Sequence, residues 1–108
     1  MRSIANLIRW ILDAADGEPI EAVVIGEPQN YAARERDKSN GIKYGALMSW
    51  DDAKRILDYP FDDGFGGAEC HPVFVWTATK VLVVREYDGS TTMGVIPRNP
   101  TACEVDYL

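Results

Sequence analysis

The chain has 108 residues, of which 46% are apolar and 26% are charged, and its formal net charge is −6. This length is typical of one domain, spanning residues 1–108, and the composition is globular. The acidic balance disfavours partners such as nucleic acid or anionic lipid, which require clustered Lys and Arg. No apolar run approaches the roughly 20 residues that cross a bilayer. The sequence therefore indicates a cytoplasmic protein with reduced cysteines and no membrane partner.

Two amphipathic helices are predicted, at residues 3–16 and 49–58. Both segments repeat apolar residues at helical spacing and carry their charges largely outside that stripe. Ser3 and Ser49 are the expected N-caps, because a serine hydroxyl accepts a hydrogen bond from a free amide of the first turn. Pro60 is expected to stop the second helix.

Five segments are expected as strands, and the sequence between the first two of them is polar. Residues 29–41 form that polar stretch, with a mixed-charge cluster at residues 34–38 that is typical of a solvated loop or a frayed helical turn. The strands themselves are short, β-branched or aromatic runs bounded by turn residues. They are Ile20–Ile25, Ile42–Met48, Val73–Thr77, Thr79–Tyr87 and Ser90–Ile96.

The last three strands are predicted to form an antiparallel meander. The dipeptide Asp88-Gly89 is a strong signal for a two-residue hairpin turn, and it pairs Val84 with Met93. A three-residue turn at 77–79 would place Phe74 beside Leu82. The expected core face then carries Phe74, Leu82, Val84, Met93 and Val95, and the opposite face carries Val75, Val81, Val83, Gly94 and Ile96.

The second face of this predicted sheet is itself apolar, so it needs cover from the chain or from another subunit. The tail from Pro97 onward contains two prolines and is expected to wrap the surface without regular structure. The fold class predicted is therefore α+β, with two helices packed on a mainly antiparallel sheet of about five strands in the order α-β-β-α-β-β-β.

The segment Tyr59–His71 holds the only histidine of the chain and an unusual concentration of reactive groups. Its candidate catalytic residues are Asp62, Asp63, Glu69 and His71, which would serve a small hydrolase-like enzyme, with or without a divalent metal. The spacing matches no metal motif, and no cofactor is predicted. The alternative is that the first two acids form a turn by accepting hydrogen bonds from nearby backbone amides.

Two further chemical interpretations of this segment stay open. Cys70 would need His71 as its base to act as a nucleophile, and neighbours in sequence rarely reach that geometry. The alternative is a buried, inert cysteine at the start of a strand. Paired carboxylates for acid–base work would be Asp62 with Glu69, or Asp63 with Asp52 or Asp58 across the helix end.

A second candidate set consists of side chains that fall outside the predicted core. Its aromatic members would line a pocket or an oligomer interface, where aromatic residues are enriched. Arg98 would join them by reaching an acid of the Gly-rich loop, and the alternative is a plain surface ion pair. The set is Trp10, Tyr59, Phe61, Phe65 and Arg98.

Several short motifs resemble a pattern seen in small uncharacterised bacterial proteins, some of which travel as mobile integron gene cassettes. These motifs are Ser49-Trp-Asp-Asp-Ala, Asp62-Asp-Gly-Phe-Gly66, Trp76-Thr77, Tyr87-Asp-Gly-Ser-Thr91 and Pro97-Arg-Asn-Pro100. They cover roughly the C-terminal two thirds of the chain. The resemblance carries no assigned activity and implies an adaptive accessory protein.

The function expected from the sequence is a homo-oligomeric binding module without catalytic activity, whose partners are itself and a protein or small ligand. The small enzyme described above is the alternative. A third hypothesis, an acidic inhibitor that mimics nucleic acid, requires carboxylates along one face, and the acids of this chain are dispersed.

Overall fold

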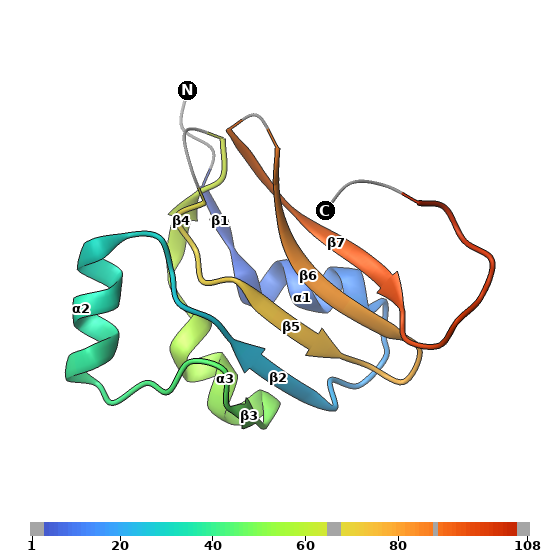
Figure 1. Ribbon diagram of the computed structural model, residues 1–108, viewed down its shortest axis with the longest axis horizontal. Coiled ribbons are helices and arrows are strands. Elements are labelled where there is room, and N and C mark those ends of the chain that lie inside the picture. The colour runs from blue at the N-terminus through green and yellow to red at the C-terminus, as the bar shows by residue number, and fades with distance from the viewer. Residues whose placement is uncertain (1–3, 65–67, 88, 106–108) are drawn as a thin grey trace.

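The computed structural model describes residues 4–64, 68–87 and 89–105. Figure 1 shows an α+β arrangement in which a sheet lies in front and α1 crosses behind it. The elements follow one another as β1 (Ile4–Asn6), α1 (Leu7–Ala15), β2 (Ala22–Ile25), α2 (Tyr31–Ser39), β3 (Leu47–Met48), α3 (Trp50–Leu57), β4 (Pro60–Asp62), β5 (Val73–Trp76), β6 (Lys80–Tyr87) and β7 (Ser90–Pro97).

The main sheet has five antiparallel strands in the order β3-β2-β5-β6-β7, and β1 pairs with β4 in a separate two-stranded sheet. The predicted α+β class and the mainly antiparallel sheet are therefore confirmed. The third helix and the small second sheet were not predicted. None of the helices in the described ranges is both long and apolar enough to cross a membrane.

The N-terminal helix begins later than the sequence suggests. The chain at Ile4–Asn6 is extended because it pairs with β4, and α1 starts only at Leu7. The N-cap is Asn6, whose side chain accepts a hydrogen bond from the amide of Ile8 at 2.9 Å. The predicted cap, Ser3, lies outside the described residues.

One face of the main sheet is covered by α1 and α3, and this is where the core lies. Leu7 and Ile11 of α1 and Leu57 of α3 are fully buried against the strands. Lys80 fixes the far end of α1, because its ammonium group lies 3.4 Å and 3.3 Å from the carbonyl oxygens of Ala14 and Ala15. A cation there complements the negative end of the helix dipole.

The β6–β7 hairpin has the predicted register, with Leu82 opposite Val95 and Val84 opposite Met93. Asp88, one of its two expected turn residues, lies outside the described residues.

The register between β5 and β6 is one residue away from the prediction. The turn contains two residues rather than three, because the amide of Thr77 donates to the carbonyl of Lys80 at 3.0 Å. Phe74 therefore pairs with Val83, and Val75 pairs with Leu82. A shift of one residue exchanges the two faces of a strand. Val75 is consequently buried in the core, and Phe74 lies on the other side of the sheet.

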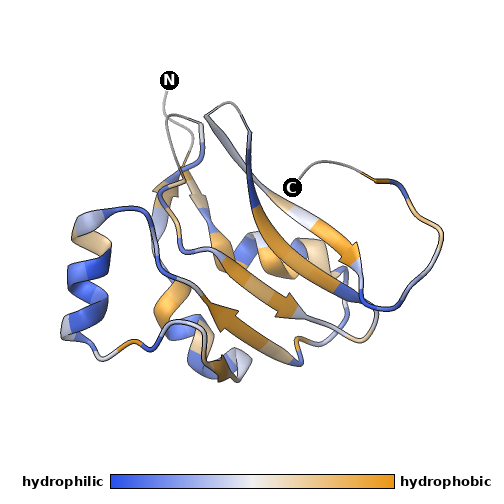
Figure 2. Cartoon of the chain, viewed as in Figure 1, coloured by the Kyte–Doolittle hydropathy of each residue, from blue (hydrophilic) through white to orange (hydrophobic). Residues whose placement is uncertain are grey.

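The polar stretch after β2 is also more ordered than predicted. Residues Tyr31–Ser39 form α2, and Asn30 caps it by accepting a hydrogen bond from the amide of Ala33 at 3.0 Å. Figure 2 shows this helix as mostly hydrophilic, in contrast to the hydrophobic strands beside it. The strand predicted over 42–48 shortens to β3, and residues 101–105 of the tail have no regular structure and are exposed.

Candidate functional site

His71 occupies a buried hydrogen-bonded network whose other members come from distant parts of the chain. It is 2% exposed and lies just before β5. Its ring atom Nε2 is 2.7 Å from Oδ2 of Asp37 on α2, and Nδ1 is 2.6 Å from the hydroxyl of Tyr59. The Tyr59 hydroxyl also accepts a hydrogen bond from the backbone amide of His71 at 2.8 Å.

A fourth residue, Tyr44, completes the network by donating its hydroxyl proton to Oδ2 of Asp37 at 2.7 Å. A neutral imidazole with its proton on Nε2 satisfies every contact, because Nε2 then donates to the carboxylate and Nδ1 accepts from Tyr59. Burial raises the pKa of Tyr59, so its hydroxyl keeps the proton that this arrangement needs. Burial and the hydrogen bond to Asp37 raise the pKa of Tyr44 to about 12.

The network borders an open cavity of about 610 Å³ whose wall includes Arg36, Arg55 and Asp58. A general base, however, needs a ring nitrogen that is free to take a proton from substrate, and both nitrogens of His71 are engaged within the protein. The geometry therefore suits a structural connection better than a reaction. The hydrogen-bonded network joins α2 to the chain segment that leads into β5.

The four candidate catalytic residues do not share one set of contacts. The first, Asp62, accepts a hydrogen bond from the amide of Gly64 at 3.0 Å, which is the backbone-bonded turn weighed as the alternative. Asp63 lines a different cavity, beside Trp10. Glu69 is exposed, and the ring of His71 has its hydrogen bonds with Asp37 and Tyr59. Across the described part of the chain, no three His, Cys, Asp or Glu residues are grouped so as to hold a metal ion.

Cys70 is buried, and burial raises the pKa of its thiol to about 12. A thiol in that state is a poor nucleophile at neutral pH, which fits the inert alternative. Cys103 is exposed in the tail, and neither cysteine is in a disulfide.

The aromatic candidates are in part core residues. Phe61 is 4% exposed, because β4 brings it under α1, so its predicted non-core position is wrong. The edge-to-face partner of Phe61 is Trp10, with ring centroids 5.2 Å apart. Tyr59 belongs to the His71 network, and Phe65 lies outside the described residues. Arg98 binds Glu21 at 2.6 Å rather than an acid of the Gly-rich loop.

Sequence reasoning missed Asp37, the central acceptor of the network, because it lies in a run of mixed charge. A signal was nevertheless present in the spacing. Asn30, Ala33 and Asp37 recur at helical intervals, so a helix capped by Asn30 puts the last two on one face. Both of them are buried in the structure.

The face of the main sheet that carries no helix is the second notable feature. We call it the open face, and it consists of two rows of side chains that run across the strands. One row is Leu47, Val24, Phe74, Val83 and Gly94, and the other is Ala22, Trp76, Val81 and Ile96.

Large apolar groups of the open face reach solvent. Leu47 is 72% exposed, Phe74 is 54% exposed and Ile96 is 38% exposed. Phe74 and Trp76 also pack edge-to-face, with centroids 6.2 Å apart. Within the described ranges no helix packs on this face, and the tail at residues 101–105 is exposed. The apolar second face predicted from the sequence is therefore present, with Phe74 in place of Val75.

Comparisons with protein-family models, with curated proteins and with solved structures found no match to the chain.

Proposed function

We propose that the chain is a non-enzymatic binding module that self-associates through its open face, as a homodimer or a higher oligomer. The observation that carries this proposal is the exposure of Leu47, Phe74 and Ile96 on a sheet face that no described helix covers. Exposed apolar patches of this kind mark interaction sites on soluble proteins.

The distribution of charge favours a second copy as the occupant. Alternation along β6 and β7 extends the open face to Arg85, opposite Thr92, and to Tyr87, opposite Ser90. On the open face of the described strands, Arg85 is the one charged residue, whereas the whole chain carries −6. Two acidic molecules repel each other through most orientations, and a face without carboxylates allows them to approach.

Symmetry supports the same occupant. A two-fold axis brings one surface against an identical copy of itself, and apolar rows satisfy that condition without paired charges. The strands are about 4.8 Å apart and two to eight residues long, which gives a face of roughly 420 Å². Two copies would then bury roughly 850 Å², a size typical of weak, transient complexes. We therefore expect dissociation in the micromolar range.

Sedimentation velocity of the wild type beside two variants tests the proposal. Phe74→Arg places a charge at the centre of the open face, and Tyr31→Arg places the same charge at an exposed aromatic residue of α2, as a matched control. We expect the wild type and Tyr31→Arg to associate at about 50 µM and Phe74→Arg to be monomeric. A monomeric wild type, or association that Phe74→Arg leaves unchanged, would contradict the proposal.

The wider role proposed here is that of an accessory protein of the cytoplasm. The motif resemblance to integron-cassette proteins and the absence of a free catalytic group in the His71 network support it. The hydrolase alternative predicts that His71→Ala abolishes an activity in purified protein, and the binding module predicts that no such activity exists to be abolished.

A further inference from the structure

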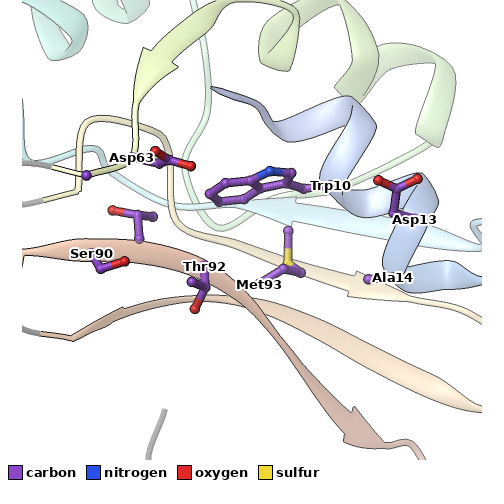
Figure 3. A pocket seen from close by; sticks show the side chains of 9 residues that line it. Trp10, Asp13, Ala14, Asp63, Ser90, Thr92 and Met93 are labelled. Atoms are coloured by element: carbon purple, nitrogen blue, oxygen red, sulfur yellow. The ribbon is translucent and has the colours of Figure 1, made fainter. Parts of the chain in front are cut away.

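A cavity lies on the other side of the molecule, between α1, the turn after β4 and the start of β7. Its volume is about 670 Å³. Figure 3 shows the indole of Trp10 between the carboxylates of Asp63 and Asp13, with the sulfur of Met93 facing the ring. Residues 90–93 of β7 form the opposite wall of the cavity, and alternation turns the side chains of Thr91 and Met93 toward α1. Acidic and aromatic groups therefore share one space.

Contacts within the fold hold this arrangement in place. The indole of Trp10 packs against Phe61 with an interplanar angle of 84°, so the buried β4 residue fixes the ring. The turn that carries Asp63 is bound to β7, because the amide of Thr91 donates to the carbonyl of Asp63 at 2.8 Å. The two sides of the cavity are consequently preorganised, which lowers the entropic cost of binding.

Among the described residues, neither carboxylate has a cationic partner. The ion pairs among the described residues involve other acids, and neither Asp13 nor Asp63 takes part in one. Arg9, one turn earlier on α1, lines an adjoining groove that shares Trp10 and both carboxylates. It pairs with neither of them. A cation that enters the cavity therefore meets two carboxylates that no other group of the described chain neutralises.

Thr91 adds a hydroxyl to the wall of the cavity, and the residue as a whole is 2% exposed. This hydroxyl is not a buried group that lacks a partner, because no buried side-chain nitrogen or oxygen atom of the described residues does. It adds a hydrogen-bonding group beside the carboxylates, which suits a ligand with a hydroxyl or amine group.

We propose that the cavity at Trp10 binds an organic cation, a protonated or quaternary amine carried on a small apolar body. The carboxylates attract the charge, and the indole stabilises it because a cation over an aromatic face is attracted by the ring. Met93 adds a polarisable apolar wall. This inference gives the binding module a ligand class, but it uses residues away from the open face. The two proposals can therefore be tested separately. A monomer that binds the cation would contradict only self-association, and a dimer that does not bind it would contradict only the cation site.

The test is an NMR titration of ¹⁵N-labelled protein, followed at the indole signals of the three tryptophans. The probes are choline and 3,3-dimethylbutan-1-ol, which has the same shape without the charge. We expect choline to shift the signal of Trp10 saturably, leaving those of Trp50 and Trp76 nearly unchanged. The neutral alcohol should bind about tenfold more weakly.

Variants locate the charge that matters. Asp13→Asn and Asp63→Asn keep the size of the side chain and should each weaken choline binding about threefold or more. Asp16→Asn is the matched control, because it removes the same charge from the end of α1 outside the cavity, and Asn accepts the left-handed conformation found there. Dispersed amide signals check the folding of each variant.

Three results would overturn the proposal. One is equal affinity for choline and the neutral alcohol, which would indicate a plain apolar or hydroxyl-binding cavity. The second is the absence of a saturable shift at Trp10 in the folded wild type. The third is wild-type affinity in both Asp13→Asn and Asp63→Asn.

Discussion

Asp37 has an unusual position for a carboxylate in a mixed-charge helix, because it is only 5% exposed. It accepts hydrogen bonds from the hydroxyl of Tyr44 and, in the neutral tautomer described above, from Nε2 of His71. Helix α2 presents few apolar groups to the rest of the molecule, and its buried residues are Ala33 and Asp37. The hydrogen bonds of Asp37 therefore attach α2 to the rest of the fold, whereas α1 is attached by its apolar stripe.

Removing the carboxylate should release α2 without unfolding the sheet. Asp37→Ala leaves His71 and Tyr44 without their shared acceptor, and a buried polar group that loses its partner costs about 1–3 kcal/mol. We expect that decrease in the free energy of unfolding, together with faster hydrogen exchange of the amides in Tyr31–Ser39. Glu35→Ala, an exposed acid on the same helix, is the control and should change neither. Unaltered exchange in Asp37→Ala would show that the network does not hold the helix.

At the scale of elements, the turn between β5 and β6 depends on a contact from outside the hairpin. Glu18, in the loop after α1, accepts hydrogen bonds from the amide of Thr79 at 3.0 Å and from its hydroxyl at 2.7 Å. Its carboxylate also lies 3.5 Å from the ammonium group of Lys80. The hydrogen bonds from Thr79 and Thr77 and the charge of Lys80 lower the pKa of Glu18 from 4.5 to about 2.

Because the pKa of Glu18 is lowered in the folded state, the free energy of unfolding depends on pH in the acid range. A carboxyl whose pKa is lower in the folded state stabilises the fold above its unfolded value, and the contribution is lost as pH falls through the folded value. The free energy of unfolding should therefore decrease between pH 4.5 and about 2. Glu18→Gln should be less stable at neutral pH and should show a shallower decrease, measured by urea denaturation at several pH values. Glu104→Gln, in the exposed tail, serves as the control, and equal slopes in all three proteins would refute the expectation.

The same turn explains why the sequence predicted one register correctly and another incorrectly. The dipeptide Asp88-Gly89 indicates a two-residue hairpin turn, so the β6–β7 register can be predicted from two residues. The loop at Ala78 and Thr79 has no such signal, and both faces of β5 are apolar. Hydrophobic alternation then does not distinguish the register, and a slip of one residue exchanges the faces.

The helices show the same division between local and distant causes. Ser49 caps α3 in the structure as predicted, accepting a hydrogen bond from the amide of Asp52 at 3.2 Å. The start of α1 depends instead on the pairing of β1 with β4, and α2 depends on Asp37. The partners of His71 were hidden for the same reason, because Asp37 lies 34 residues away in the sequence.

At the scale of the whole molecule, the chain forms a slab of two layers that measures 40 × 32 × 20 Å. Figure 1 looks down the shortest of these axes, onto the sheet, with α1 on the far side. One layer of helices covers one face of a sheet whose two faces are both apolar. Self-association would supply the missing layer, and it would leave the cavity at Trp10 accessible on the other side.

The most direct test of self-association is a dilution series followed by the methyl signals of isotope-labelled protein. From about 1 mM to about 10 µM, a range that spans the micromolar dissociation expected above, the signals of Val24, Val83 and Ile96 should shift together. The methyl of Ala32, exposed on α2, should stay constant. Signals on the open face that do not move over this range, or movement confined to α2, would contradict association through the open face.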